Sequence, residues 1–122
     1  MALAAAADKG LLLIMLCQGA LEAIDESLAA IDAKDYEGKN RLLVRAQDIV
    51  LQLSDALDEG VGGEMAVNLR RLYQYIYSEL VRGNTRLDKE AILRGRRVMA
   101  DLTQTWQRVV LGDDSSRFNV GQ

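Results

Sequence analysis

The sequence contains no histidine and no proline, and it has a single cysteine among its 122 residues. Histidine is the side chain that most often transfers protons near neutral pH, and it is also the commonest metal ligand. Without it, Cys17 has no imidazole base to activate its thiol, and the Glu-x-x-His motifs of di-iron helical bundles cannot occur. The sequence therefore indicates that the protein is not an enzyme and that it holds no metal or other cofactor.

The missing prolines and the scarcity of aromatic residues favour helices throughout the chain. Only one tryptophan, four tyrosines and one phenylalanine are present, and glycine is the one residue type that forces a break. Cys17 has no partner for an internal disulfide and lies in an apolar run, as expected for a buried thiol in a reducing compartment. These features predict an all-α protein in the cytoplasm.

Charge and hydropathy argue against nucleic acid and membrane as partners. The net charge is −3 with both signs interspersed, so the chain lacks the broad basic field that attracts nucleic acid. The apolar run at Leu11–Leu16 is far shorter than the roughly 20 residues that cross a bilayer, which predicts no membrane insertion. A bulky leucine directly before Cys17, with Asp8 upstream, also argues against a secretory or lipoprotein signal.

Apolar residues recur at three- and four-residue intervals in four stretches, which predicts four long helices. These are expected at residues 8–33, 35–58, 64–84 and 88–110. Short connections make consecutive helices antiparallel. The predicted fold class is therefore all-α, an antiparallel up-down four-helix bundle with or without a short extra N-terminal helix. We expect one domain at 1–122 with its core at about 8–110, and a disordered tail at 112–122, where the periodicity stops.

Each predicted helix has one apolar side that we expect to face the core. In chain order the inward residues are Leu12, Met15, Leu16, Gly19, Ala23, Ile24, Leu28 and Ile31; Leu42, Leu43, Ala46, Ile49, Val50, Leu53 and Leu57; Met65, Leu69, Leu72, Tyr73, Ile76 and Leu80; and Gly95, Val98, Met99, Leu102, Trp106 and Val109. Asp35 and Asp88 are placed to cap the helices that follow them. Gly60–Gly63 allows a chain reversal, and Gly83 with Asn84 is expected to end the third helix in left-handed backbone.

The sequence carries more apolar residues than a four-helix core needs. The run at Leu11–Leu16 is apolar on every side of a helix, and the second helix doubles its apolar positions at Leu42–Leu43 and Ile49–Leu51. Exposed apolar strips of this kind suit a groove that receives a partner's amphipathic segment. Burial in a homodimer, or in a fuller core, is the alternative.

Aromatic and amide side chains on the second and third helices fit a peptide-binding surface. Tyr73, Tyr75 and Tyr77 point in different directions, so at least one should reach the surface. Three amides lie within or beside the apolar stripes, where they need hydrogen-bonding partners: Asn40, Gln47 and Asn68. Those partners are either a bound peptide backbone or other groups of the bundle and its water.

Several segments together resemble the flagellar secretion chaperone family (FliS). The resemblance runs roughly over residues 12–110, in L-I-M-L-C-Q-G-A-L, in K-D-Y-E-G-K-N with A-Q-D-I-V, and in N-L-R-R-L-Y-Q-Y with the closing G-N. Cys17 and Gln18 stand where the family has Tyr and Asp. Where the family has a short tyrosine-containing segment, this chain begins M-A-L-A-A-A-A-D-K-G.

The resemblance implies a cytoplasmic chaperone that binds the disordered C-terminal segment of flagellin, prevents premature polymerisation and aids type III flagellar secretion. It also implies the flagellar export gate as a second partner, and a monomer or weak homodimer. We expect the client contacts at Leu43, Gln47, Val50, Asn68, Leu72, Tyr75 and Asn84. A self-associating structural or regulatory bundle without a flagellin client is the competing hypothesis.

Overall fold

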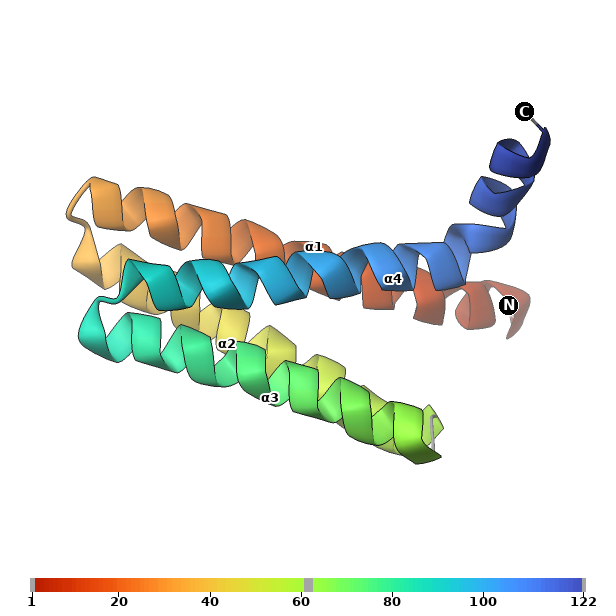
Figure 1. Ribbon diagram of the computed structural model, residues 1–122, viewed down its shortest axis with the longest axis horizontal. Helices are drawn as coiled ribbons and strands as arrows, with labels where there is room; N and C mark the ends of the chain where they lie inside the picture. The colour runs from red at the N-terminus through yellow and green to blue at the C-terminus, as the bar shows by residue number, and fades with distance from the viewer. Residues whose placement is uncertain (1, 61–62, 122) are drawn as a thin grey trace.

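A computed structural model describes the backbone at residues 2–60 and 63–121, and the side chains at residues 9–57 and 63–111. The chain forms four helices: α1 (Ala2–Asp32), α2 (Tyr36–Gly60), α3 (Gly63–Arg86) and α4 (Lys89–Gly121). They run alternately up and down along one long axis (Figure 1). Each helix packs against two neighbours, α1 against α2 and α4, and α3 against the same two. The predicted all-α antiparallel four-helix bundle is thereby confirmed.

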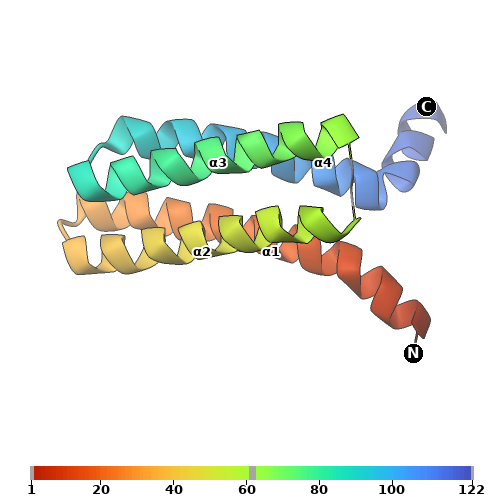
Figure 2. The same ribbon diagram turned by 90° about the horizontal axis from the view of Figure 1, so that it is seen from below.

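The two terminal helices are longer than the sequence pattern predicts. Helix α1 begins at Ala2 and continues without a break, so the described chain has no separate N-terminal helix. Helix α4 continues to Gly121 instead of ending near Val110, and the tail that we expected to be irregular is helical there. No proline interrupts it, and an established helix adds one backbone hydrogen bond for each further residue. The last turns of α4 bend away from the bundle (Figures 1 and 2).

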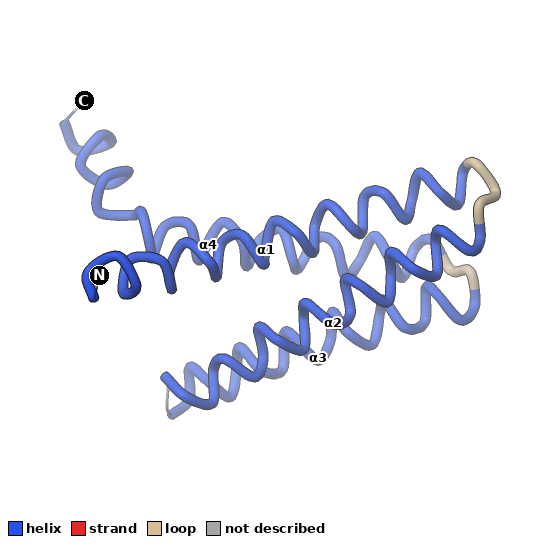
Figure 3. Tube along the Cα trace, turned by 180° about the vertical axis from the view of Figure 1, so that it is seen from behind, coloured by secondary structure: helices blue, strands red, loops and turns tan. Residues whose placement is uncertain are grey.

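Tight turns with one left-handed residue join α1 to α2 and α3 to α4. Lys34 has a φ of 59°, and the amide of Asp35 donates to the carbonyl of Ala30 at 2.8 Å, which is a Schellman ending for α1. Helix α3 ends in the same way, because Leu87 has a φ of 52° and the Asp88 amide donates to the Gly83 carbonyl at 3.1 Å. These turns are the tan segments in Figure 3.

The predicted left-handed ending at Gly83 and Asn84 is therefore wrong. Gly83 is helical and lies where α3 approaches α4, because a Cβ built on it would overlap Cγ1 of Ile92 and lie 3.1 Å from the Asp88 carbonyl oxygen. The glycine thus serves a close approach between helices. The left-handed position falls instead on a leucine, which has to adopt a conformation that glycine accepts more easily.

Both predicted N-caps are confirmed. The Asp35 carboxylate accepts a hydrogen bond from the Gly38 amide at 3.0 Å, and the Asp88 carboxylate accepts one from the Ala91 amide at 3.2 Å. Each bond joins the cap to the third residue of the helix, where the backbone amide has no partner inside the helix. Two aspartates therefore fix where α2 and α4 begin.

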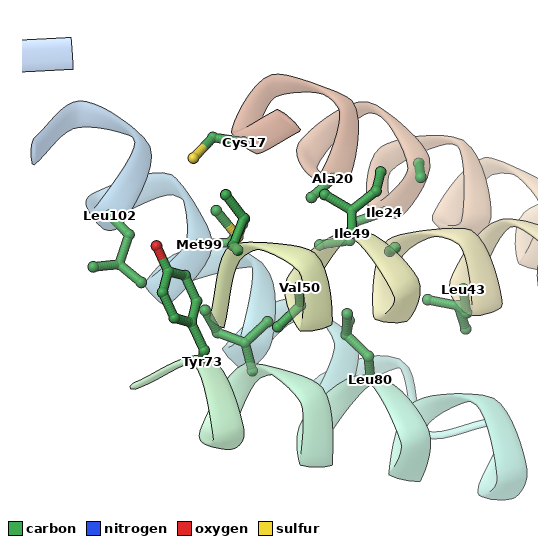
Figure 4. Packing of buried hydrophobic residues seen from close by; sticks show 14 of the residues in the cluster. Cys17, Ala20, Ile24, Leu43, Ile49, Val50, Tyr73, Leu80, Met99 and Leu102 are labelled. Atoms are coloured by element: carbon green, nitrogen blue, oxygen red, sulfur yellow. The ribbon is translucent and has the colours of Figure 1, made fainter. Parts of the chain in front are cut away.

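The core is one cluster to which all four helices contribute (Figure 4). Its buried members are Cys17, Ala20, Ala23, Ile24, Leu43, Ala46, Ile49, Val50, Leu53, Leu57, Tyr73, Ile76, Leu80, Ile92, Met99 and Leu102. The predicted stripe of α2 matches this cluster closely, with only Leu42 left half-buried. On the other helices, five residues that we expected inside are exposed: Leu12, Met15, Met65, Leu72 and Val109.

Two pairs of polar side chains lie among the apolar side chains of α1, α3 and α4: Trp106 with Tyr73, and Cys17 with Thr103. The indole nitrogen of Trp106 donates to the hydroxyl oxygen of Tyr73 at 2.9 Å. Burial raises the pKa of Tyr73 to about 12, against the opposing effect of this hydrogen bond. Burial likewise raises the pKa of Cys17 to about 11, opposed by a hydrogen bond with Thr103. Both groups therefore stay neutral well above physiological pH.

Candidate functional site

An open groove of about 320 Å³ lies between α2 and α3. Val50 and Tyr73 form its floor, since each exposes only 1% of its surface. Leu51, Ser54, Gln74, Tyr77 and Ser78 form its walls. Leu51 is 45% exposed although it is a large aliphatic side chain. The bundle therefore leaves apolar surface uncovered along this groove.

The helical period of α2 explains why the groove is apolar. Residues three or four apart share a side of a helix, so Val44, Gln47, Leu51 and Ser54 follow one another along the edge of α2 that borders α3. Val44 is 41% exposed and Gln47 is half-buried. The apolar strip therefore extends from the groove toward the beginning of α2.

A second hollow, of about 300 Å³, continues from the groove along α3. Its lining residues are Tyr77, Ser78, Val81, Arg82, Thr85 and Arg86. It shares Tyr77 and Ser78 with the groove. The two hollows together form a track along α3, with uncharged residues in the first part and arginines in the second.

At the end of α3 that carries the second hollow, α2 and α3 are joined by hydrogen bonds around Asn84. The ammonium group of Lys39 donates to the Asn84 carbonyl oxygen at 2.9 Å and to its side-chain oxygen at 2.8 Å. The Asn84 side-chain nitrogen donates to Asn40 at 2.8 Å. The side-chain oxygen and nitrogen of Asn84, a predicted contact residue, therefore have hydrogen-bonding partners inside the bundle, and so does the side-chain oxygen of Asn40.

The opposite edge of α3 faces α4 and carries another exposed apolar strip. Leu72 is 40% exposed and Tyr75 is 42% exposed. The Tyr75 hydroxyl donates to the Glu79 carboxylate at 3.3 Å, and Glu79 in turn pairs with Arg94 of α4. Asn68 is exposed and lies one turn before Leu72. This strip is separated from the groove by the body of α3.

The predicted contact residues thus fall into three groups: two in or beside the groove, three on the α4 edge of α3, and two that the bundle itself buries or binds. Gln47 and Val50 lie at the groove, whereas Asn68, Leu72 and Tyr75 lie on the α4 edge of α3. Leu43 exposes no surface, so a partner on the bundle surface would not reach it. Asn84 forms hydrogen bonds to Lys39 and Asn40 of α2.

Sequence reasoning missed several residues of the groove wall. Leu51 and Tyr77 were recognised as surplus apolar or aromatic positions, but the contact set left both out, together with Ser54, Gln74 and Ser78. The doubled apolar run at Ile49–Leu51 was the signal for Leu51. No pattern in the sequence marks the two serines.

The chemistry of the groove suits binding. Its lining has no carboxylate, thiol or basic side chain, so it offers no general acid or base near neutral pH. Among the described residues, no group of three or more Cys, Asp or Glu side chains is placed to hold a metal ion. Within the same residues, no helix has both the length and the apolarity to cross a membrane.

Comparison with known proteins decides the family. The family model described as "Flagellar protein FliS" matches residues 2–112. The chain belongs to the FliS family. This confirms the resemblance seen in the sequence, and it extends the match to the alanine-rich start of α1.

Relatives with the same family name come from several bacteria. The flagellar secretion chaperone FliS of Bacillus subtilis is 28% identical over 115 residues, which cover 94% of this chain and 85% of the relative. FliSB of Pseudomonas aeruginosa is 32% identical over 98 residues, covering 80% and 78%. FliS of Salmonella typhimurium is 30% identical over 99 residues, covering 80% and 73%. All three are named flagellar secretion chaperones.

Proposed function

We propose that this protein is a cytoplasmic export chaperone that binds the disordered C-terminal segment of flagellin in the groove between α2 and α3. By covering that segment, it prevents premature polymerisation and keeps the client ready for type III flagellar secretion. The observation that carries this proposal is the exposed apolar surface of the groove, where Leu51 stands uncovered above the buried Val50 and Tyr73. Membership of a family whose relatives are named secretion chaperones supports it.

A disordered client needs an extended apolar track. Ordering such a segment costs conformational entropy, so the complex must gain many contacts over a long surface. The groove and the hollow that continues it offer such a surface along α3. The client lies there as an amphipathic helix with its apolar side toward Leu51 and Tyr77.

The strip on the α4 edge of α3 gives the client a second contact. Leu72 and Tyr75 together expose an aliphatic and an aromatic side chain, with the amide of Asn68 one turn away. Gln47 offers another amide beside the groove. These amides pair with client backbone groups where the client leaves one surface of α3 for the other.

Calorimetry with a synthetic flagellin C-terminal peptide tests the proposal. We expect saturable binding with a negative heat-capacity change, because apolar surface is removed from water. Gel filtration of the mixture should show a one-to-one complex. If neither heat nor a complex is found at high micromolar concentration, flagellin is not the client.

A substitution in the groove locates the binding surface. Covering the exposed part of Leu51 is worth about 1 kcal/mol, and an aspartate at this position would also have to lose water beneath the client. Leu51→Asp should therefore weaken binding by about tenfold or more. Leu93→Asp is the matched control, since Leu93 is also partly exposed, at 36%, but lies on α4, which does not pack against α2. Equal losses in both variants would refute the groove as the site.

The competing hypothesis, a self-associating bundle, rests on the same exposed strips. A homodimer that buries Leu51 and Val44 would need no client. Sedimentation analysis separates the two hypotheses, because such a dimer would persist on dilution and Leu51→Asp would convert it into a folded monomer. A wild-type monomer that binds the peptide would exclude this alternative.

A further inference from the structure

The hollow that continues the groove contains two arginines that have no partner among the described side chains. Arg82 and Arg86 both line it, and both are exposed. None of the hydrogen bonds or ion pairs among the described residues involves either guanidinium group. The lining contains no acidic residue. Two positive charges are therefore available at one end of an otherwise uncharged track.

The neighbouring helices do not neutralise these charges. The beginning of α2 lies beside the end of α3, as the bonds from Lys39 and Asn40 to Asn84 demonstrate. Exposed charged residues on this part of α2 balance one another, two acidic and two basic: Glu37, Asp48, Arg41 and Arg45. On the α4 edge, Glu79 is engaged by Arg94, and Asp88 caps α4. Glu90, the exposed carboxylate in the first turn of α4, has the positive charge of Arg94 one turn away on the same helix. The positive character of this end therefore comes from α3.

The spacing of the two arginines matches a helix that lies along α3. Four residues rise about 6 Å along a helix, so Arg82 and Arg86 lie one turn apart on the same side. Two carboxylates four residues apart on a neighbouring helix have the same spacing. Guanidinium groups bind carboxylates through paired N–H donors, which favours this arrangement over a single point contact.

We propose that the track accepts an acidic amphipathic helix in one orientation, with apolar side chains over Leu51 and Tyr77 and two carboxylates over Arg82 and Arg86. This inference rests on the proposed function, because it specifies the chemistry of the client segment bound in the groove. The apolar part holds the segment in place, and the arginines set its direction. A segment bound in the reverse direction would place its carboxylates beside the uncharged walls formed by Leu51 and Gln74.

Exposed charges at the rim of a binding site act mainly on association, because they attract the partner before contact. Arg82→Glu with Arg86→Glu should therefore lower the association rate constant for a flagellin C-terminal peptide by about tenfold at low salt. The effect should shrink at high salt, where the charges are screened. The dissociation rate constant should also rise, because the paired guanidinium–carboxylate contacts are lost. Stopped-flow mixing with a labelled peptide measures both constants.

Two comparisons make the test specific. The control Arg97→Glu with Arg108→Glu changes the net charge equally but on exposed positions of α4, and it should alter association by less than about twofold. A peptide whose acidic residues are replaced by Asn and Gln should bind wild-type protein more slowly. The Arg82→Glu, Arg86→Glu variant should bind this neutral peptide better than the acidic one.

The outcomes distinguish this inference from the function on which it rests. If wild-type protein binds the peptide and the two arginine variants associate equally fast, the inference is wrong while the proposed function stands. If only dissociation accelerates, without salt dependence, the arginines support the fold and the inference is again wrong. If wild-type protein does not bind the peptide at all, both fall together.

Discussion

Replacing each of two interfacial glycines with alanine tests the packing of α3 against α4. Gly83 has no room for a methyl group, because a Cβ there would overlap Cγ1 of Ile92 and lie 3.1 Å from the Asp88 carbonyl oxygen. Ile92 exposes no surface, so its side chain cannot swing into solvent. Gly95 differs, since its Cβ would meet Glu79 at 3.4 Å and Leu80 at 3.5 Å, which is ordinary van der Waals contact.

The two substitutions should therefore have opposite effects on the free energy of unfolding. Alanine gains up to about 1 kcal/mol over glycine from helix propensity, and Gly95→Ala should keep most of this gain. Overpacking a closed interface costs about 1 to 3 kcal/mol. Gly83→Ala, with less propensity to gain in the last turn of α3, should be destabilised by up to about 2 kcal/mol.

Urea unfolding followed by circular dichroism measures the free energy of unfolding of both variants, and Gly83→Ala is also measured in protein that carries Ile92→Ala. Because Ile92→Ala removes Cγ1, adding Gly83→Ala to it should cost less than in the wild type, with a coupling of at least about 0.5 kcal/mol. If Gly83→Ala stabilises the protein as much as Gly95→Ala does, a methyl group fits between Gly83 and Ile92, and the inferred tight contact is refuted.

Two further predictions concern the buried polar side chains Tyr73 and Cys17. Tyr73→Phe leaves the Trp106 indole nitrogen without its acceptor and should lower the free energy of unfolding by about 1 to 3 kcal/mol. Tyr75→Phe, the control, should lower it by less than half as much. Equal losses in urea unfolding would contradict a stabilising role for the bond between Trp106 and Tyr73. Alkaline pH should destabilise the fold, because the unfolded chain loses the Cys17 and Tyr73 protons near pH 9 and 10, while the folded chain holds them until about 11 and 12. Stability should then fall between about pH 9 and pH 12, by roughly 2 to 3 kcal/mol for each group. Cys17→Ala should flatten the lower part of that decline, and an unchanged profile would show that the thiol is not responsible.

The sequence predicted the parts of the fold where one local signal was strong. Asp35 and Asp88 marked the helix starts correctly, because an aspartate before an amphipathic stretch is a specific capping signal. The α2 stripe was placed correctly, since its polar and apolar sides differ clearly. In α1, the run at Leu11–Leu16 is apolar all round, so periodicity could not show that Met15 faces solvent.

Glycine and amide positions were harder to interpret from sequence. Gly83 next to Asn84 has the composition of a left-handed helix end, but the same glycine also suits a tight contact between helices, and only the position of Ile92 decides between the two. Nothing in the sequence near Asn84 predicts that Lys39, 45 residues earlier, donates hydrogen bonds to it. The groove wall depends on such long-range placement, which explains why Leu51 and Tyr77 were absent from the predicted contact set.

The two ends of the bundle differ in how firmly the helices are held together. At the end with the two Schellman turns, hydrogen bonds join α2 to α3 through Asn84, and Lys89 of α4 reaches Asp32 of α1 at 2.8 Å. Toward the other end, the α1–α4 pair and the α2–α3 pair separate (Figures 1 and 3). We therefore expect partial unfolding to start at the separated end, with backbone amides near Asn84 exchanging their hydrogens with water later than those near Ala66.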